Sequence, residues 1–279
     1  RPGALERFRR EAIAAGRRDH PRIVTVHDAG ETDGRAFIAM RLVPGDPLSA
    51  RIARSGALAP DDALLVLADI AAAIDFAHAN GTIHRDVTPG NILLDPAGGA
   101  FLSDFGLVRM DDMPGLTRRG DWLGTAEYVS PVLGVGEPAG AASDRYALGA
   151  VAFEALTGRA PHVHHEPSAI LLAHVRDPVP EATAINPALP AAVDEVLTRA
   201  LAKDPAERPA RAEELVEDLR AALGRGPAVP AGGAAAPVHP RPASCSAGRA
   251  RPVSARASAA TEAAPASPRG HALPPIAGR

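Results

Sequence analysis

Three oxygen-bearing side chains that lie close together in the sequence could act on a phosphate group. Asp86 and Asn91 belong to the polar run at residues 84–91, and Asp104 follows a short apolar stretch. Two carboxylates and a carboxamide are hard oxygen ligands of the kind that binds Mg²⁺, and a carboxylate also accepts a proton from an attacking hydroxyl. The sequence therefore predicts a site for a magnesium-bound nucleotide.

Short strands and a tight loop must bring these side chains together. Apolar residues bracket the polar loop, within which Pro89 and Gly90 prevent a helix from continuing. Residues 101–103 are predicted to form a strand that delivers Asp104 to the same place, and Gly106 allows a sharp turn after it. The three oxygen-bearing side chains are expected to converge on one ligand.

Longer elements are expected on both sides of this loop. Apolar periodicity and turn residues predict two strands that meet across residues 33–34, and several helices. Ser143 and Asp144 are expected to cap the helix that ends at Gly158. The strands are expected within residues 20–28 and 36–42, and the helices over residues 5–15, 60–80, 143–158, 190–202 and 211–223.

Composition excludes several function classes. The net charge of −3 gives no electrostatic footprint for nucleic acid. The single cysteine, Cys245, excludes an internal disulfide and fits a reducing compartment. No apolar run approaches the length of a membrane span and no signal peptide is visible, so a soluble, cytoplasmic chain is expected. Residues 225–279 are rich in Ala, Pro, Arg and Ser and are predicted to form a disordered tail.

Several motifs occur in the order that one enzyme family shows. H-R-D-x-x-x-x-N at residues 84–91, followed by D-F-G at 104–106, is a two-part signature that rarely arises by chance. Three supporting motifs follow at residues 124–131, 143–149 and 201–209. From about residue 5 to about residue 223, the chain resembles the catalytic domain of bacterial, actinobacterial-type, eukaryotic-like serine/threonine protein kinases.

The resemblance implies an α+β, protein-kinase-like fold. Residues 1–43 would form a partial N-lobe and the hinge, with only helix C and the last two strands. Residues 44–224 would form a mostly helical C-lobe, followed by the tail. ATP and Mg²⁺ would be the cofactors, and the substrate would be a protein hydroxyl.

The resemblance also assigns roles in the catalytic loop. Asp86 would orient and deprotonate the substrate hydroxyl, while Asn91 and Asp104 would hold Mg²⁺. Arg85 would pair with a phosphothreonine near Thr117 in the activation segment. The alternative for Thr117, a residue that is never modified, has similar weight.

The nucleotide would lie between the lobes. Glu11 corresponds to the helix C glutamate, which normally pairs with a strand lysine. Met40 would lie at the back of the adenine pocket, and the backbone of residues 41–43, including Arg41 and Val43, would form the hinge. Leu93 is expected to contact the nucleotide as well.

Three further residues resemble functional positions of the family. Thr125 would bond to the catalytic aspartate and shape the substrate site. Asp144 would hold the backbone of the catalytic loop. Arg208 would pair with a glutamate at the end of the activation segment.

Four departures from the family pattern bear on activity. No glycine-rich loop precedes Glu11, and the only lysine, Lys203, lies far into the C-lobe, which suggests a truncated N-terminus. Thr88 stands where the family has a phosphate-contacting lysine, a loss worth on the order of 10²–10³ in rate. Val132 stands where a glutamate would pair with Arg208, and an unpaired buried arginine would cost about 3–5 kcal/mol.

Two function classes therefore remain in competition. The leading one is a protein serine/threonine kinase, and Thr88 and Val132 motivate the other, a pseudokinase that binds partners without transferring phosphate. A small-molecule phosphotransferase is disfavoured, because such enzymes lack the D-F-G motif and the motif at residues 124–131. The substrate, the activating signal and the oligomeric state stay open.

Overall fold

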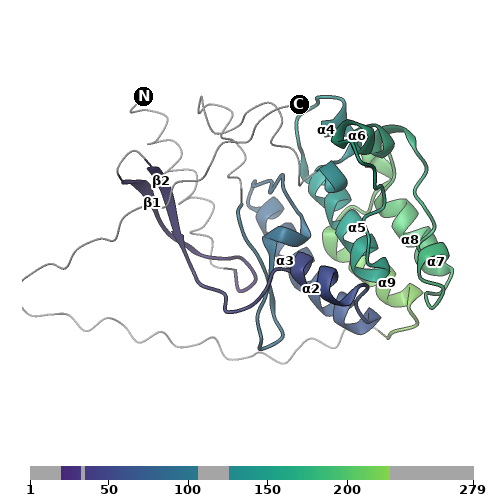
Figure 1. Ribbon diagram of the computed structural model, residues 1–279, viewed down its shortest axis with the longest axis horizontal. Coiled ribbons are helices and arrows are strands. Elements are labelled where there is room, and N and C mark those ends of the chain that lie inside the picture. The colour runs from purple at the N-terminus through teal and green to yellow at the C-terminus, as the bar shows by residue number, and fades with distance from the viewer. Residues whose placement is uncertain (1–19, 33–34, 106–125, 227–279) are drawn as a thin grey trace, which may run out of the picture. The chain divides into compact units, whose positions relative to one another are not determined.

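The computed structural model describes residues 20–32, 35–105 and 126–226 (Figure 1). One antiparallel hairpin comes before the helices in the sequence, and a second follows α3 (Pro60–Ala79). The helix expected over residues 5–15 and the tail from residue 227 onward lie outside the described residues. In chain order, the elements are β1 (Val26–Thr32), β2 (Arg35–Met40), α2 (Leu48–Ser55), α3 (Pro60–Ala79), η1 (Pro89–Asn91), β3 (Ile92–Leu94), β4 (Ala100–Leu102), η3 (Ala126–Tyr128), α4 (Pro131–Gly134), α5 (Ala141–Thr157), α6 (Pro167–Arg176), α7 (Ala182–Ile185), α8 (Ala192–Ala200), η4 (Pro205–Glu207) and α9 (Ala212–Ala222).

The two hairpins flank α2 and α3 in the sequence. β1 and β2 pair from Val26↔Met40 to Thr32↔Arg35, with an irregularity near the start of β1. β3 and β4 pair from Ile92↔Leu102 to Leu94↔Ala100. The second hairpin is short, and it connects the polar loop at residues 84–91 to Asp104.

The segment before β1 attaches the first hairpin to the second. Ile23 forms a parallel bridge with Leu102, and the N–H of Val24 donates to the Leu102 carbonyl at 2.9 Å. The N–H of Leu102 in turn donates to the Arg22 carbonyl at 2.9 Å. β4 therefore has hydrogen-bonded partners on both sides, and its end, which leads to Asp104, is held firmly.

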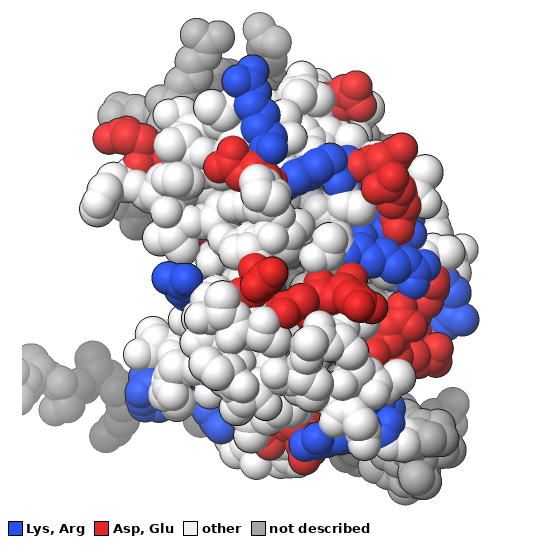
Figure 2. All heavy atoms as spheres, turned by 90° about the vertical axis from the view of Figure 1, so that its right-hand side faces the viewer, with Lys and Arg blue, Asp and Glu red and all other residues white. Residues whose placement is uncertain are grey.

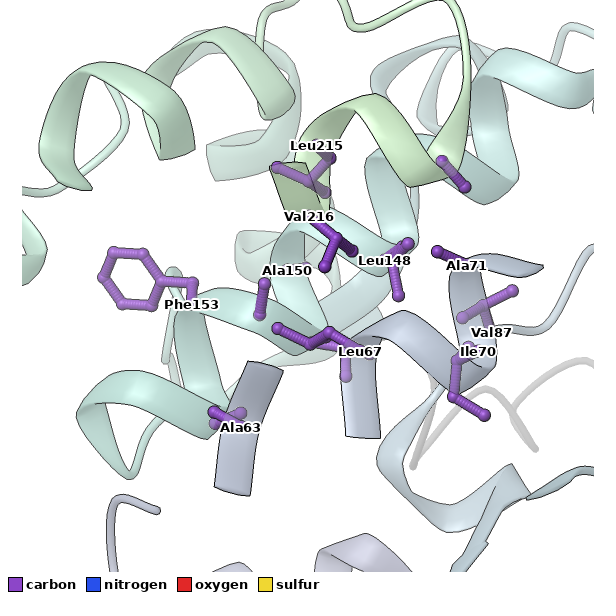
Figure 3. Close-up of a cluster of buried hydrophobic side chains, with 14 of the residues drawn as sticks. Ala63, Leu67, Ile70, Ala71, Val87, Leu148, Ala150, Phe153, Leu215 and Val216 are labelled. Atoms are coloured by element: carbon purple, nitrogen blue, oxygen red, sulfur yellow. The ribbon is translucent and has the colours of Figure 1, made fainter. Parts of the chain in front are cut away.

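Helices α3, α5 and α9 pack together around the main hydrophobic core (Figure 3). Leu67 and Ile70 of α3 face the core because apolar residues recur along that helix at helical spacing. Leu148 and Phe153 of α5 are fully buried, as are most residues of that helix, so α5 is a central element rather than a surface one. Val87 of the polar loop joins the same core, which ties the loop to the helices.

The structure corrects one expectation about α5. Its first helical residue is Ala141 and its N-cap is Gly140, so neither Ser143 nor Asp144 is the N-cap residue, but Ser143 takes part in the cap as the third helical residue of a capping box. Ser143 lies one turn into the helix, where its Oγ accepts the N–H of Gly140 at 3.2 Å. Asp144 points elsewhere, because its carboxylate is engaged by another part of the chain.

Other helices differ from expectation in extent. α2 and α6 were not predicted, because each is short, with 8 and 10 residues respectively. α8 and α9 are shorter than the ranges expected for them, within the usual uncertainty of helix ends. Among the described residues, none of the helices combines the length and the apolar character that crossing a membrane requires.

Candidate active site

The polar loop at residues 84–91 is anchored by a carboxylate from α5. Asp144 is 1% exposed, and its Oδ2 accepts the N–H of His84 at 2.8 Å while its Oδ1 accepts the N–H of Arg85 at 2.7 Å. His78 of α3 places its Nε2 2.7 Å from the same Oδ2. Three donors from two segments therefore converge on one buried carboxylate, which fixes the loop relative to α3 and α5.

The imidazole of His84 connects the loop to the end of β4. Its Nδ1 accepts the N–H of Asp86 at 3.2 Å, so the proton lies on Nε2, which donates to the Ser103 carbonyl at 2.8 Å. Burial lowers the pKa of His84, against the opposing charge of Asp144, and keeps the ring neutral. The ring also meets Phe105 edge to face at 4.4 Å, so both parts of the two-part signature are in contact.

Two residues of the site adopt a backbone conformation that L-residues rarely adopt. Arg85 has φ of 74° and Asp104 has φ of 63°. Among the described residues, they are the only non-glycine positions with positive φ, and each costs about 1–3 kcal/mol. Such strain persists where surrounding contacts fix the backbone, and here it occurs at two of the predicted site residues.

Hydrogen bonds connect the three oxygen-bearing side chains. Asn91 Nδ2 donates to the Asp86 carbonyl at 2.8 Å and to Asp86 Oδ2 at 2.9 Å. The Asn91 carbonyl accepts the Ser103 N–H at 2.9 Å and the Ser103 hydroxyl at 3.1 Å. The same hydroxyl lies 3.1 Å from Asp104 Oδ2. Asp86, Asn91 and Asp104 thus belong to one hydrogen-bonded group, in which the main-chain carbonyl of Asn91 and the hydroxyl of Ser103 make the link to Asp104.

One carboxylate oxygen in this group has no partner. Asp86 Oδ1 is buried and makes no hydrogen bond to any described residue. Leaving such an oxygen without a donor is costly, so a site of this kind suits an incoming hydroxyl group. Among the atoms of Asp86, Asn91 and Asp104 in the described residues, Asp86 Oδ1 is the buried one that lacks a hydrogen-bond partner.

The side-chain oxygen atoms of Asn91 and Asp104 suit coordination of a hard cation. Asn91 turns its amide nitrogen toward Asp86, so its Oδ1 is directed elsewhere and remains an oxygen ligand. Within the described ranges, no cluster of three or more His, Cys, Asp or Glu side chains could hold a metal ion. A site made of Asn91, Asp104 and ligand phosphates matches Mg²⁺, which takes one or two carboxylates and retains other oxygen ligands.

The expected nucleotide-side residues fall into two groups. Val43 is buried with Val24 and Phe101, and Leu93 packs against this small cluster. Met40, in contrast, has a side chain that is 36% exposed and does not belong to the cluster. The structure therefore brings Val43 and Leu93 together on one apolar surface and leaves Met40 outside it.

Arg41 has a defined position at the expected hinge. Its N–H donates to the Thr25 carbonyl at 2.8 Å, and its guanidinium lies 4.7 Å from the centre of the Phe101 ring. These contacts tie the end of β2 to β4. The backbone N–H of Arg41 is occupied, which leaves hinge contacts to other main-chain groups of residues 41–43.

Thr88, which departs from the family pattern, and Arg208, whose expected glutamate partner is replaced by Val132, are both buried. Thr88 is 7% exposed and its side chain makes no capping hydrogen bond to η1. Arg208 is 3% exposed, and burial lowers its pKa to about 10, so the guanidinium stays charged at neutral pH.

Each side-chain nitrogen of Arg208 has a hydrogen-bond partner even though Val132 stands in place of the glutamate. Its three nitrogens donate to the carbonyls of Ala202, Ala142 and Lys203 at 2.8, 2.8 and 3.0 Å. Its guanidinium also lies 4.8 Å from the centre of the Tyr146 ring. The expected cost of an unpaired buried arginine is therefore not incurred, because main-chain carbonyls replace the missing carboxylate.

Three predicted residues lie outside the described residues: Glu11, Thr117 and Thr125. Two residues that matter in the geometry were not predicted, namely His78 and Ser103. Ser103 directly precedes Asp104, so its position in the sequence was a usable signal. His78 lies in the last turn of α3 and shows nothing in the sequence that links it to Asp144.

Comparison with known proteins bears on the same residues. The family described as "Protein kinase domain" matches residues 2–219. The serine/threonine-protein kinase PknD of Mycobacterium tuberculosis is 42% identical over 203 residues, which cover 72% of this chain and 31% of PknD. The serine/threonine-protein kinase PrkC of Bacillus subtilis is 39% identical over 219 residues, which cover 78% of this chain and 34% of PrkC.

A solved structure has a similar fold over much of the chain. The crystal structure of Rad53 residues 1–466 in complex with AMP-PNP matches with a TM-score of 0.63 and 25% identity, and covers 75% of this chain and 53% of that one. The chain spans only about a third of the length of PknD and PrkC. The expected protein-kinase-like fold and the resemblance to bacterial serine/threonine kinases are both confirmed. This chain belongs to the protein kinase domain family.

Proposed function

We propose that this chain forms the larger part of a serine/threonine protein kinase domain, which transfers the γ-phosphate of ATP to hydroxyl groups of protein substrates. The observation that carries the proposal is Asp86, whose Oδ2 is held by Asn91 while its buried Oδ1 has no partner among the described residues. The names of the relatives support the same reaction. Such a reaction belongs in the cytoplasm, where ATP is available.

Asp86 acts on the substrate hydroxyl. Its free Oδ1 accepts the hydroxyl hydrogen and orients the oxygen lone pair toward the phosphorus, and the carboxylate takes the proton as the new bond forms. Asn91 fixes the rotation of the carboxylate through two hydrogen bonds, so little reorganisation is needed when the substrate arrives.

Asn91 and Asp104 are proposed to hold Mg²⁺ against the phosphate chain. When bound, Mg²⁺ supplies positive charge that offsets the charge on the phosphate oxygens. The strained backbone of Asp104 and the hydroxyl of Ser103 aim the Asp104 carboxylate. Thr88 would offer the same phosphate a neutral hydroxyl where the family has a cationic lysine.

The adenine ring is proposed to lie on the apolar surface formed by Val43 and Leu93, with main-chain groups of residues 41–43 as its hydrogen-bond partners. Met40 would border this pocket. Glu11 would take the position of the helix C glutamate, and Lys203, the only lysine in this sequence, lies in the C-lobe and is not its expected partner.

Regulation is proposed to act through the activation segment. Phosphorylation of Thr117 would create a partner for Arg85, whose guanidinium forms no ion pair with any described residue. Thr125 would hydrogen-bond to Asp86 and shape the site for the substrate.

The test is phosphate transfer from radiolabelled ATP to a serine- and threonine-containing protein. The measurement uses the chain extended upstream by the segment that precedes residue 1. We expect Mg²⁺-dependent transfer that falls by at least about 100-fold in Asp86→Asn. Asp177→Asn, an exposed change outside the site, is the matched control and should transfer normally. No transfer by the unchanged extended chain, or full transfer by Asp86→Asn, contradicts the proposal.

A pseudokinase is the second candidate, and Thr88 is the observation that favours it, because it removes a positive charge from the phosphate site. Val132 no longer adds to this case, since Arg208 has partners without a glutamate. A thermal shift on adding Mg²⁺ and ATP, without any transfer, would identify a pseudokinase.

A further inference from the structure

A groove on the C-terminal helices contains none of the residues of the candidate active site. It has a volume of about 760 Å³ and lies between the chain after α6, one side of α8 and the turn that leads into η4. This volume falls within the range of ordinary binding pockets. The residues that define this "α8 groove" in the argument below are Val179, Glu181, Glu195, Thr198, Leu201 and Glu207.

Carboxylates dominate the rim of the α8 groove. Glu181, Glu195 and Glu207 are exposed, and none of them forms an ion pair with another described residue. Asp194 adds a fourth carboxylate, which is occupied by hydrogen bonds from the N–H and hydroxyl of Thr183. Figure 2 faces the side of the molecule that carries α7 and α8 and shows acidic side chains gathered across its middle.

The two cations of the groove do not neutralise this rim. Arg199 is engaged outside the groove by Glu214 at 2.6 Å and by Asp218 at 2.8 Å, both on α9. Lys203 donates from its Nζ to the His174 carbonyl at 2.8 Å, a neutral partner, so its charge still offsets one carboxylate of the groove. The groove has four carboxylates against this one unpaired cation and therefore presents net negative charge to whatever enters it.

The floor of the groove is apolar. Leu201 is almost fully buried, and Val179 is partly buried against the main core. Pro178 and Ala202 complete the apolar lining. An apolar floor beneath an acidic rim suits a ligand that combines positive charge with a hydrophobic side chain.

We propose that the α8 groove docks an arginine-containing segment of a partner protein, with an apolar side chain of that segment seated on Pro178 and Val179. Arginine suits the rim because its planar guanidinium binds a carboxylate through two parallel hydrogen bonds, and its methylene stem covers apolar surface. An acidic segment would be repelled by Glu181, Glu195 and Glu207.

The test is fluorescence anisotropy with the full 279-residue chain and a short fluorescein-labelled peptide that carries three arginines around one leucine. We expect saturable binding that weakens as sodium chloride is raised, because exposed charges are screened. A peptide with glutamine in place of each arginine should not bind. Equal binding of the two peptides overturns the proposal.

Two kinds of variant locate the binding site. Glu195→Gln combined with Glu207→Gln should weaken peptide binding by about 3- to 20-fold, the effect of losing two largely exposed ion pairs. Thr198→Arg places a cation in the groove at an exposed helical position, and should weaken binding by about tenfold or more. Glu217→Gln, an exposed change on α9 outside the groove, is the matched control and should bind normally.

Circular dichroism melting shows whether each variant is folded. Unchanged affinity in both groove variants, or equal weakening by Glu217→Gln, overturns the proposal. A dimer in light scattering that Thr198→Arg abolishes would assign the groove to a second copy of the chain and also overturn it. None of these measurements uses phosphate transfer, so their outcome is independent of the proposed enzyme activity.

Discussion

Asp144 holds Arg85 in a left-handed backbone conformation through a 2.7 Å hydrogen bond between residues 59 positions apart. The φ of 74° at Arg85 is unfavourable for an arginine, so a contact from α5 must stabilise it. The same carboxylate accepts the N–H of His84 at 2.8 Å. The geometry of the polar loop at residues 84–91 therefore depends on Asp144, a residue of the buried helix α5.

Replacing Asp144 by asparagine should destabilise the protein. An amide offers one acceptor oxygen instead of two and turns an N–H group toward a backbone N–H or toward His78. We expect the free energy of unfolding in urea to fall by about 2–4 kcal/mol. Asp177→Asn, an exposed change after α6, should alter it by less than about 0.5 kcal/mol. An equal free energy of unfolding for the two variants would show that the Asp144 carboxylate does not stabilise the conformation of the loop.

Replacing Arg208 by methionine should also destabilise the protein, although no carboxylate pairs with it. The change leaves the carbonyls of Ala202, Ala142 and Lys203 without their donor, at a cost of about 2–4 kcal/mol in unfolding free energy. Arg208→Lys should recover only part of this loss, because one ammonium group cannot reach three carbonyls in the geometry of a guanidinium.

The control for Arg208 is Arg159→Met, an exposed change that should be nearly neutral. Urea unfolding of the four proteins in parallel is the measurement. If Arg208→Met lowers the free energy of unfolding no more than Arg159→Met does, the three hydrogen bonds make no net contribution to stability.

Introducing a lysine at position 88 should raise the rate of phosphate transfer. Thr88 supplies no charge, whereas an ammonium group near the transferred phosphate stabilises the transition state. We expect Thr88→Lys to increase the rate of the upstream-extended chain by about 10- to 100-fold. Thr88→Met, of similar length but neutral, is the control, and a lysine variant no faster than it would contradict the prediction.

Acid should weaken the fold through a buried pair of histidines. The rings of His162 and His174 lie 4.8 Å apart, and the Tyr146 hydroxyl lies 2.7 Å from His174 Nδ1. Burial, and then the neighbouring charges of His162 and Lys203, lower the pKa of His174 to about 3. Burial, followed by Lys203, lowers the pKa of His162 to about 4.

Both groups therefore stay neutral in the folded state while they become protonated in the unfolded state. The unfolded chain binds more protons below a pH of about 6.5, so stability is complete above that pH and is lost as the pH falls toward 4. Each histidine contributes a slope of at most about 1.4 kcal/mol per pH unit. His174→Gln should flatten the dependence of Tm on pH between about 6.5 and 4, whereas His165→Gln at an exposed position should not. Parallel Tm profiles for His174→Gln and the unchanged chain would contradict this assignment.

The fold could be predicted from the sequence to the extent that local rules act. The second hairpin and α3 follow from turn residues and apolar spacing, and both are present close to their expected positions. The capping role predicted for Asp144 was wrong, because its carboxylate makes a tertiary contact instead, whereas Ser143 does contribute to the cap, as the third helical residue. α6 was missed because its short apolar stripe is weak without the neighbours that cover it.

The candidate site, like the fold, could be predicted from the sequence only in part. Residue types and their order named Asp86, Asn91 and Asp104, because the chemistry of a magnesium-bound phosphate restricts which side chains can serve it. They did not indicate that Asp86 keeps one oxygen unpaired, that Ser103 links Asn91 to Asp104, or that carbonyls satisfy Arg208.

The sequence alone thus determined the family, the chemical groups and their order along the chain, since these depend on local composition and spacing. Only the tertiary structure decided which partner each buried polar group has and where the α8 groove lies. Those features join segments tens of residues apart, and the requirement that buried polar groups find partners can be met in many ways that spacing does not distinguish.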